Sequence, residues 1–343
     1  QGITYAPCHS SIGGFILQYP RAVNLENGTA MVVTDLHGEG EIYATIRHKF
    51  MEMRRAGTVD KLIICGDLIH GYRAADHDYS LNMLLNLMKL RQDIGEDQVI
   101  MLLGNHEMPH IYNVTLSKGN MEFTARFEQA LSQSGRRDDV FDFLCSLPFY
   151  VFTKAGVVLT NAGASHVIID AEEAERALTF DHRALLKLAD DQLRNGFDLE
   201  RLQKDQAYIQ QARHFIGISG AEDERLHHLL RGQLLSQRNE EFSFLWDLLF
   251  TRNEQGSSLG AYMHLVDVFL AAMSQLAPYE QRVIVAGHIS VRGGHKNMGD
   301  KQLRLASYAH ASPHDDGQYL LLDCEQAVQT ASDLVPHLRH TLD

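Results

Sequence analysis

Polar side chains that can bind a metal or move a proton recur directly after short apolar runs in this chain of 343 residues. The groups, in chain order, are Thr34–Gly38 (TDLHG), Gly66–Gly71 (GDLIHG), Gly104–Glu107 (GNHE), Asn161–Gly163 (NAG) and Gly287–His288 (GH). Carboxylate oxygens, an amide oxygen and imidazole nitrogens together suit Mn²⁺, iron or Zn²⁺ better than Ca²⁺. Glycines beside these groups allow sharp turns and close approach to a ligand. The pattern therefore indicates a transition-metal site.

The groups differ in how specific they are. An Asp-x-His after a strand and a single Gly-Asp are both common in ordinary structural turns. Gly-Asn-His-Glu after an apolar run, at Gly104–Glu107, is more specific. The metal site is inferred from the ordered set, since each group alone is weak evidence.

Short apolar runs precede each group and predict buried strands. They are Ala30–Thr34, Lys61–Cys65, Val99–Leu103, Val157–Thr160 and Arg282–Ala286. Continuous hydrophobicity over about five residues is typical of strands buried on both faces. Helical patterns at Glu41–Ala56 and Tyr79–Arg91 separate the first three runs, so the first half reads as βαβ units. Ligands in such folds gather beyond the carboxyl ends of the strands, where the polar groups lie.

The pattern changes to charged helical segments between residues 169 and 276. The predicted helices are Ala171–Leu178, His182–Arg194, Leu199–Ile216, Asp223–Leu235, Glu240–Phe250 and Leu259–Leu276. Strand character returns at Arg282 and at Gln318–Asp323. We therefore predict a core of residues 3–168 plus 277–343 and a helical insertion of residues 169–276 that caps the strand ends. A helical subdomain without contact to any site remains the alternative.

The composition of the chain indicates which partners and which cellular compartment to expect. The chain has 31 lysines and arginines and 44 aspartates and glutamates, so its formal net charge is 31 − 44 = −13. This negative charge argues against nucleic acid or an anionic membrane as partner. A small anionic substrate remains compatible, because bound metals supply local positive charge. The four cysteines form no Cys-x-x-Cys pair, and no signal peptide or membrane span is evident, so we expect a cytoplasmic protein. The oligomeric state cannot be inferred.

The ordered groups resemble the motifs of the calcineurin-like metallophosphoesterase superfamily. The likeness is greatest to its phosphoprotein phosphatase branch, which includes Ser/Thr phosphatases and diadenosine tetraphosphatases. That branch carries Gly-Asp-x-His-Gly, Gly-Asp-x-x-Asp-Arg-Gly, Gly-Asn-His-Glu, His-Gly-Gly and a late histidine, and the groups listed above follow the same order. The resemblance implies an α/β fold (α+β by some schemes): a central β-sandwich of two mixed sheets flanked by helices, here with a helical cap insertion.

The resemblance also implies roles for individual residues. Two divalent metals, Mn²⁺ first and Fe or Zn²⁺ as alternatives, would activate a water against phosphorus. Asp35 and His37 would bind the first metal and Asp67 would bridge the two. Asn105, Asn161 and His288 would bind the second metal, and His106 would protonate the leaving group.

Three positions depart from the family pattern. Asn161 stands where the family has histidine, which weakens the second metal site unless His166 substitutes. His70-Gly71-Tyr72 replaces Asp-Arg-Gly, which removes a phosphate-binding arginine and the carboxylate that orients the catalytic histidine. Arg73 and Arg252 are the candidates for the missing phosphate clamp. For both arginines a solvated structural role remains open.

The predicted function is hydrolysis of a phosphate monoester, either a phosphoprotein or a small phosphorylated metabolite. Hydrolysis of dinucleoside polyphosphates or other nucleotide pyrophosphates is the alternative, since the same metal core serves both. A non-catalytic binding protein on a degenerate phosphatase fold is the alternative of another class. The histidines in the loops after the fifth predicted strand are His295, His310 and His314. A surface position is expected for them, and the alternative is that one of them lines the site.

Overall fold

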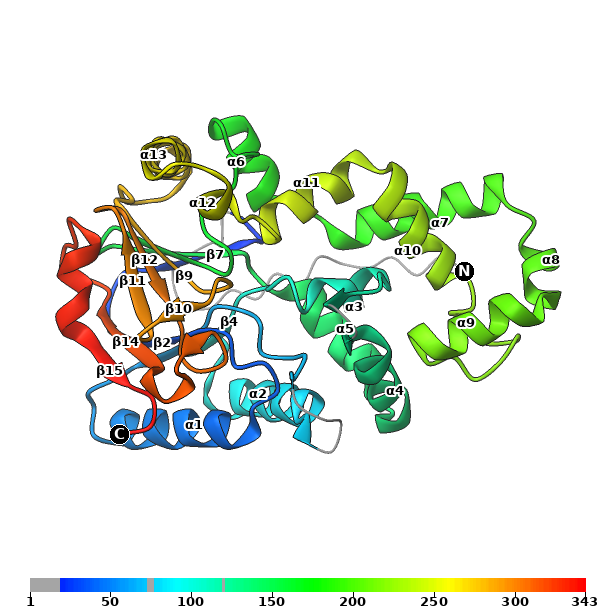
Figure 1. Ribbon diagram of the computed structural model, residues 1–343, viewed down its shortest axis with the longest axis horizontal. Coiled ribbons are helices and arrows are strands. Elements are labelled where there is room, and N and C mark those ends of the chain that lie inside the picture. Colours follow the sequence, from blue (N-terminus) through cyan, green and yellow to red (C-terminus); the bar gives the residue numbers. More distant parts are fainter. Residues whose placement is uncertain (1–18, 73–76, 119–120) are drawn as a thin grey trace.

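Two β-sheets lie at the centre of the fold (Figure 1). The computed structural model describes residues 19–72, 77–118 and 121–343. The six-stranded sheet has the order β1 (Ala22–Leu25), β7 (Tyr150–Thr153), β8 (Val157–Thr160), β9 (Val283–Ala286), β12 (Gln302–Leu305), β11 (His295–Met298). The five-stranded sheet has the order β15 (Leu338–His340), β14 (Gln318–Asp323), β2 (Thr29–Val33), β3 (Lys61–Ile64), β4 (Val99–Met101). Each sheet mixes parallel and antiparallel pairs, so the predicted sandwich of two mixed sheets is confirmed.

Alternate residues of each central strand face the space between the two sheets. Ala30 and Val32 of β2 pack there against Val157 and Leu159 of β8. Met31, between Ala30 and Val32, belongs instead to the core on the outer face of its sheet. Because both faces are buried, these strands are hydrophobic at every position, as their sequence predicted.

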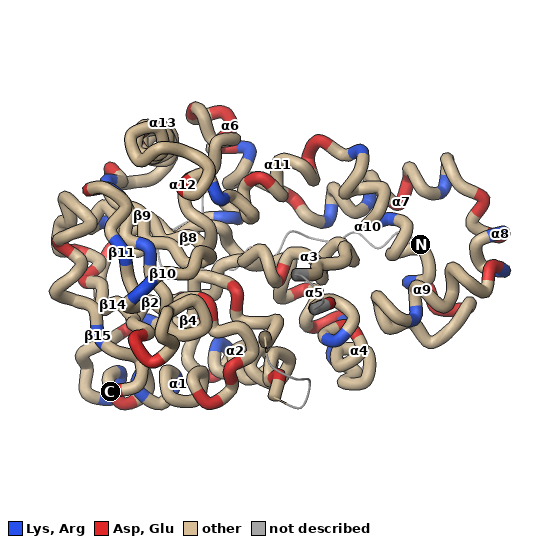
Figure 2. Tube along the Cα trace, in the orientation of Figure 1, with Lys and Arg blue, Asp and Glu red and all other residues tan. Residues whose placement is uncertain are grey.

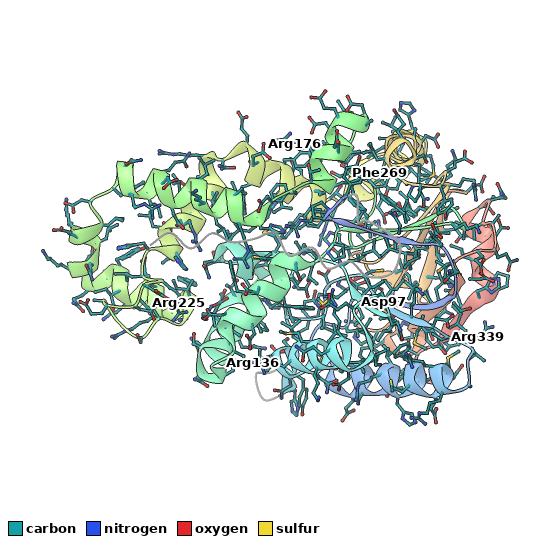
Figure 3. The ribbon with its side chains drawn as sticks, turned by 180° about the vertical axis from the view of Figure 1, so that it is seen from behind. Asp97, Arg136, Arg176, Arg225, Phe269 and Arg339 are labelled. Carbon is teal, nitrogen blue, oxygen red and sulfur yellow. The ribbon has the colours of Figure 1, made fainter. Side chains whose placement is uncertain are left out.

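Helices cover the outer face of each sheet. Helices α1 (Gly40–Arg55) and α2 (Ser80–Ile94) lie along the five-stranded sheet, and α6 (Ala171–Leu178) and α13 (Leu259–Leu276) lie on the opposite side of the sandwich. Figure 3 shows the same layers from behind, with Phe269 labelled on α13. The Phe269 ring packs on Tyr150 of β7 at a centroid separation of 5.9 Å. By length and composition α13 is the one described helix that passes as a membrane span, yet this packing makes it a covering layer of the sheet.

The remaining helices form an extension beside the sandwich. Helices α3 (Met108–Tyr112), α4 (Thr124–Ser134) and α5 (Arg137–Ser146) follow β4. Helices α7 (His182–Gly196), α8 (Leu199–Lys204), α9 (Gln206–Ile216) and α10 (His228–Arg238) form a lobe beyond them, and α11 (Glu240–Leu249) and α12 (Asn253–Gly256) lead back to the sheets. Short pairs β5 (Ser117–Lys118) with β6 (Met121–Glu122) and β10 (Val291–Arg292) with β13 (Ala311–Ser312) complete the elements that position the site, and η2 (His314–Asp316) and η3 (Ala331–His337) are short 3₁₀ helices.

Two predicted helices are wrong in part. The segment predicted as Asp223–Leu235 is helical only from His228, in α10. The segment Leu199–Ile216 contains two helices, because Asp205 adopts an extended conformation between them. Its carboxylate accepts hydrogen bonds from the backbone N–H groups of Ala207 (2.9 Å) and Tyr208 (3.3 Å), which caps α9. The proposed division into core and insertion stays a prediction.

Charged residues of both signs are interspersed along the lobe. In Figure 2, both basic and acidic positions occur on α7 and α8. Arg194 pairs with Asp191 at 2.5 Å, and Arg231 of α10 pairs with Asp190 at 3.2 Å. The negative net charge is therefore accompanied by many local ion pairs.

Candidate metal centre

The turns that follow β2, β3 and β9 have a strained backbone. Six described residues other than glycine have positive φ, and five of them lie in these turns: Asp35 (50°), His37 (40°), Asp67 (53°), His70 (70°) and His288 (69°). The left-handed region is unfavourable for residues with a Cβ, by roughly 1–3 kcal/mol each. Such strain persists where the surrounding structure holds it and is concentrated at functional sites.

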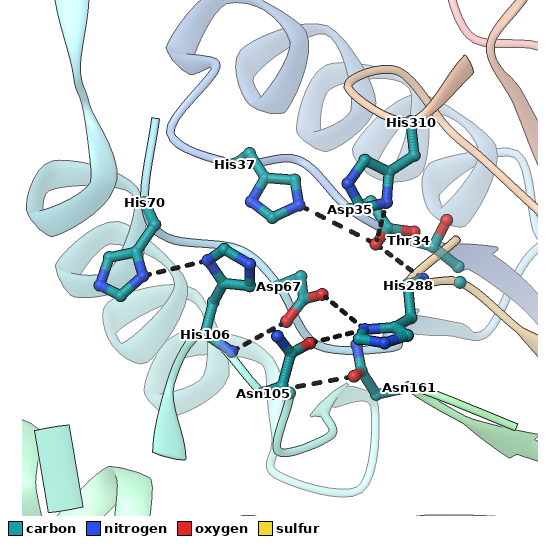
Figure 4. Close-up of polar contacts among 12 residues, drawn as sticks. Thr34, Asp35, His37, Asp67, His70, Asn105, His106, Asn161, His288 and His310 are labelled. Carbon is teal, nitrogen blue, oxygen red and sulfur yellow. Dashed lines mark hydrogen bonds and ion pairs between the residues drawn. The ribbon is translucent and has the colours of Figure 1, made fainter. Parts of the chain in front are cut away.

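These turns bring the predicted site residues together in one buried cluster (Figure 4). The cluster contains Asp35, His37, Asp67, Asn105, His106, Asn161 and His288, and each is at most 7% exposed. Glycines allow the close approach. A Cβ on Gly287 would collide with the Asp35 carboxylate, and a Cβ on Gly104 would collide with Asp67. Their roles as ligands or catalytic groups stay predictions.

Backbone hydrogen bonds fix the two carboxylates. The N–H of His288 donates to Asp35 Oδ1 at 2.8 Å, and the N–H of His106 donates to Asp67 Oδ1 at 3.1 Å. His288 Nδ1 lies 2.8 Å from the side-chain amide of Asn105 and 3.9 Å from Asp67 Oδ2. The side chains from four separate turns therefore lie at distances that one or two ions can bridge.

Several buried polar atoms in the cluster lack a partner. Among the described residues, Asp35 Oδ2, His37 Nε2 and His288 Nε2 are buried without a hydrogen bond. Buried polar atoms are nearly always satisfied, so each such atom requires an explanation. The Nδ1 of His37 lies 3.2 Å from the Ile69 carbonyl, to which it can donate, leaving an Nε2 lone pair. Oxygen and imidazole donors of this kind fit a divalent transition metal.

His310 belongs to the buried cluster, although the sequence analysis favoured a surface position for it. Only 7% of it is exposed, and its Nδ1 lies 2.9 Å from Asp35 Oδ1. Asp35, His37 and His310 offer ligand atoms that all lie within 4.8 Å of one another, as do His37, Asp67 and His106. The backbone N–H of Ala309 donates to the Asp35 carbonyl at 3.3 Å, which anchors the loop. In the sequence, the only sign of a site role for His310 was its late position in the chain, after Gly287–His288.

Asn161 is held by the backbone on both sides of its amide. Its Nδ2 donates to the Cys65 carbonyl at 2.9 Å, and its Oδ1 accepts from the Asn105 N–H at 3.4 Å. The amide oxygen therefore faces the cluster. His166 is exposed, and its Nδ1 lies 3.4 Å from Asn253 Nδ2, so it takes no part in these contacts.

Burial shifts the protonation of the cluster. Burial and the charge of Asp35 raise the pKa of Asp67 to about 7. Burial alone would raise the pKa of Asp35, but the charge of His310 and its hydrogen bond hold that pKa below the ordinary value. Burial, with nearby Arg304 and Arg252, lowers the pKa of His288 to about 3. Divalent cations would favour this combination of carboxylates and neutral imidazoles.

Glu107 ties two of the turns together. Its carboxylate accepts hydrogen bonds from the N–H groups of Asp67 (3.0 Å), Leu68 (2.9 Å) and Gly104 (3.1 Å). Burial and the charge of Asp67 raise the pKa of Glu107 to about 8. Its contacts are with backbone, so it holds the turns after β3 and β4 in register.

Arg73 and Arg252 were the predicted phosphate clamps, and the structure describes only Arg252. Arg73 lies outside the described residues. Arg252 is exposed and directly precedes the short helix α12, where Glu254 forms an ion pair with the buried Arg304. Arg304 in turn donates to the carbonyls of Ala162 (3.0 Å) and Gly287, so Arg252 is anchored close to the turns of the cluster.

A family model described as calcineurin-like phosphoesterase matches residues 28–313. The chain belongs to this family, and it is a metal-dependent phosphatase-type hydrolase. The model spans every residue of the buried cluster, including His310. The comparison with curated protein sequences gave no significant match.

Solved structures of phosphatases resemble the fold at low identity. A protein serine/threonine phosphatase from Saccharomyces cerevisiae, with similarity to human phosphatase PP5, gives a TM-score of 0.46 and 16% identity over 92% of this chain and 80% of that chain. A cold-active protein-tyrosine phosphatase of a psychrophilic Shewanella species gives a TM-score of 0.42 and 16% identity, over 89% of this chain and 78% of that chain. A metallophosphoesterase from Sphaerobacter thermophilus gives a TM-score of 0.34 and 11% identity, over 90% of this chain and 91% of that chain.

Proposed function

We propose that the chain hydrolyses a phosphate monoester, carried by a phosphoprotein or by a small phosphorylated metabolite, with two bound divalent metals. The observation that carries this proposal is the convergence of Asp35, His37, Asp67 and His288 in one buried cluster with unpartnered donor atoms. Asn105, Asn161 and His310 complete the proposed ligand set. We propose Mn²⁺ as the metal, with Fe or Zn²⁺ as alternatives. When bound, such metals supply a water-derived nucleophile at neutral pH and neutralise phosphoryl charge.

His106 is the proposed proton donor to the leaving oxygen. Its Nδ1 lies 3.0 Å from His70 Nδ1, and Figure 4 shows its other ring nitrogen turned toward Asp67. A ring held through one nitrogen presents the other to substrate in a fixed direction, which general acid catalysis requires. His70 stands where the family has the orienting aspartate, and its ring orients His106 in place of that carboxylate.

Arg252 is the proposed clamp for the phosphate oxygens. Its guanidinium is exposed, and its charge acts on both Tyr72 and His288. A planar fork of N–H donors matches phosphoryl oxygens. We also propose a cytoplasmic location, because the described thiols of Cys65, Cys145 and Cys324 are free and buried.

Turnover of a substrate panel tests this function. The Mn²⁺-loaded protein is assayed on phenyl phosphate, bis(p-nitrophenyl) phosphate and diadenosine tetraphosphate, with Asp67→Asn as the inactive control. Monoester hydrolysis that Asp67→Asn abolishes is the expected result. Turnover of diadenosine tetraphosphate alone would establish the pyrophosphohydrolase instead. A fully metal-loaded protein that turns over none of the three would favour the binding-protein alternative.

A further inference from the structure

A row of buried polar side chains runs from His106 away from the metal cluster. His70 Nδ1 lies 3.0 Å from His106 Nδ1, and His70 Nε2 lies 2.6 Å from His110 Nε2. His110 Nδ1 lies 2.7 Å from Glu128 Oε1. The exposed fractions are 7% for His106, 1% for His70, 5% for His110 and 0% for Glu128. Two turns and two helices, α3 and α4, therefore contribute to one continuous chain of hydrogen bonds that ends at a carboxylate.

Glu128 is charged at the far end of this row. Burial alone would raise its pKa, but its hydrogen bond with His110 and the guanidinium of Arg137 more than offset burial, so its pKa lies below the ordinary value. Arg137 Nη2 lies 2.7 Å from Glu128 Oε2. A carboxylate only accepts hydrogen bonds, so the Nδ1 of His110 must donate to it.

The charge of Glu128 sets the direction of every bond in the row when the rings are neutral. A neutral His110 that donates through Nδ1 accepts at Nε2, so the Nε2–H of His70 donates to it. His70 then accepts at Nδ1, from the Nδ1–H of His106. This places the lone pair of neutral His106 on Nε2, the nitrogen turned toward Asp67. The proton given to the leaving oxygen is the one that Nε2 carries when His106 is an imidazolium, whose Nδ1–H still donates to His70.

Aromatic packing holds the middle of the row. Phe123 stacks on His70 with a centroid separation of 5.3 Å and an interplanar angle of 11°. Phe127 packs on His110 at 4.4 Å. The Ser80 hydroxyl accepts the backbone N–H of His70 at 2.8 Å, which supports the positive φ of that residue. The rings therefore have little freedom to break the row by rotation.

We propose that Glu128 is a remote positioning residue for His106, acting through His110 and His70, and that it replaces the carboxylate missing from the Asp-Arg-Gly position. This proposal rests on the proton-donor role given to His106 above. His70 and His110 are positioning residues as well, because neither reaches the reacting atoms. Partners of this kind, one or two side chains away from the chemistry, typically contribute roughly 10–100-fold.

The kinetic test is a double-mutant cycle of Glu128→Gln with His70→Asn. Asparagine is among the residues that tolerate positive φ best, and its Oδ1 can replace the Nδ1 acceptor of His70 without a second nitrogen for His110. In the wild-type background, Glu128→Gln should lower kcat on phenyl phosphate by roughly 10–100-fold with KM and metal content unchanged. In the His70→Asn background, Glu128→Gln should lower kcat no further. If the kcat losses of the two substitutions multiply instead, Glu128 does not act on His106 through His70, and the proposal is overturned.

A second variant protects the test against misfolding. His110→Asn retains a donor for Glu128 but removes the nitrogen that contacts His70, so it should reproduce the kcat loss without exposing a buried charge. His182→Gln is the matched control, because it breaks an equally buried histidine bond, that of Tyr112 Oη to His182 Nδ1 at 2.6 Å, outside the row. An equal kcat loss in His182→Gln would mean that the effect is structural.

The tautomer of His106 separates this proposal from the proposed function. Long-range ¹⁵N–¹H spectra of the metal-free protein should show His106 protonated on Nδ1 in wild type and a mixture of tautomers in His110→Asn. An unchanged tautomer in that variant would overturn the relay. A changed tautomer with unchanged turnover of phenyl phosphate would support the relay and overturn the proton-donor role of His106.

Discussion

His310 Nδ1 lies 2.9 Å from Asp35 Oδ1, although the two residues come from opposite ends of the chain. Asp35 follows the first central strand, β2, and His310 lies in the loop before β13. The contact closes the cluster on the side of His37, whose ring centroid is 4.7 Å from that of His310. The two ends of the sequence thus meet at the proposed metal.

His310→Ala should weaken metal binding by roughly 10–100-fold, because the variant loses an imidazole that contacts a metal carboxylate. Metal titration followed by calorimetry gives the affinity directly. His314→Ala, an exposed histidine of η2 on the other side of β13, is the control and should bind metal like wild type. Equal affinities in wild type and His310→Ala would exclude His310 from the metal site.

His106→Ala should lower kcat by roughly 10²–10⁴-fold while metal content stays near two equivalents. The loss should shrink on p-nitrophenyl phosphate, whose leaving group needs no protonation, compared with phenyl phosphate. Parallel assays on both esters with elemental analysis make the measurement. A loss of the same size on both esters would assign His106 to binding of metal or substrate.

Local pattern was enough to predict the elements whose burial is regular. The strand Val157–Thr160 and the helices Ala171–Leu178 and Leu259–Leu276 occur at the predicted bounds. The strands Ala22–Leu25 and Tyr150–Thr153 were not predicted, because they are defined by pairing with each other across a long stretch of sequence.

The site was predictable to the extent that its residues follow strands directly. Asp35, Asp67 and Asn105 do so, and a parallel arrangement of strands forces them to one edge. His310 does not, since it is placed by a loop that returns to Asp35. The link from His70 to Glu128 depends on helix packing, which no spacing in the sequence reveals.

Asn161 is tested by two substitutions that separate metal binding from stability. Asn161→Asp offers the metal a charged oxygen but places it against the Cys65 carbonyl, which now accepts from Nδ2 at 2.9 Å. It should lower the metal midpoint and also destabilise the metal-free protein, by about 1–3 kcal/mol. Asn161→Ala should raise the midpoint and destabilise as well. Unchanged midpoints in both variants, beside lower melting temperatures, would leave Asn161 a purely structural residue.

Arg252→Ala should raise KM for a monoester by roughly tenfold, the equivalent of about 1.4 kcal/mol, because a charge-assisted hydrogen bond to phosphate is lost. Arg252→Lys should recover part of this, since lysine keeps the charge without the fork. Arg238→Ala, an exposed arginine at the end of α10, is the control. Steady-state kinetics that show no change in KM for Arg252→Ala would leave phosphate binding to other groups.

His228 should make stability depend on pH in a window far from the metal. Burial, with the charges of Arg231, Arg225 and Arg137, lowers its pKa to about 3 in the folded protein, against about 6.5 when unfolded. Between these values the unfolded chain holds the extra proton, so the free energy of unfolding falls as pH drops below 6.5, by up to about 1.4 kcal/mol per pH unit. The stabilisation is complete above pH 6.5 and fully lost near pH 3.

His228→Gln should therefore make the free energy of unfolding depend less on pH. The measurement is urea unfolding of the metal-free protein from pH 7 to 4.5. The control His264→Gln, exposed on α13, should follow wild type. Parallel curves for wild type and His228→Gln would mean that His228 takes up its proton equally in both states.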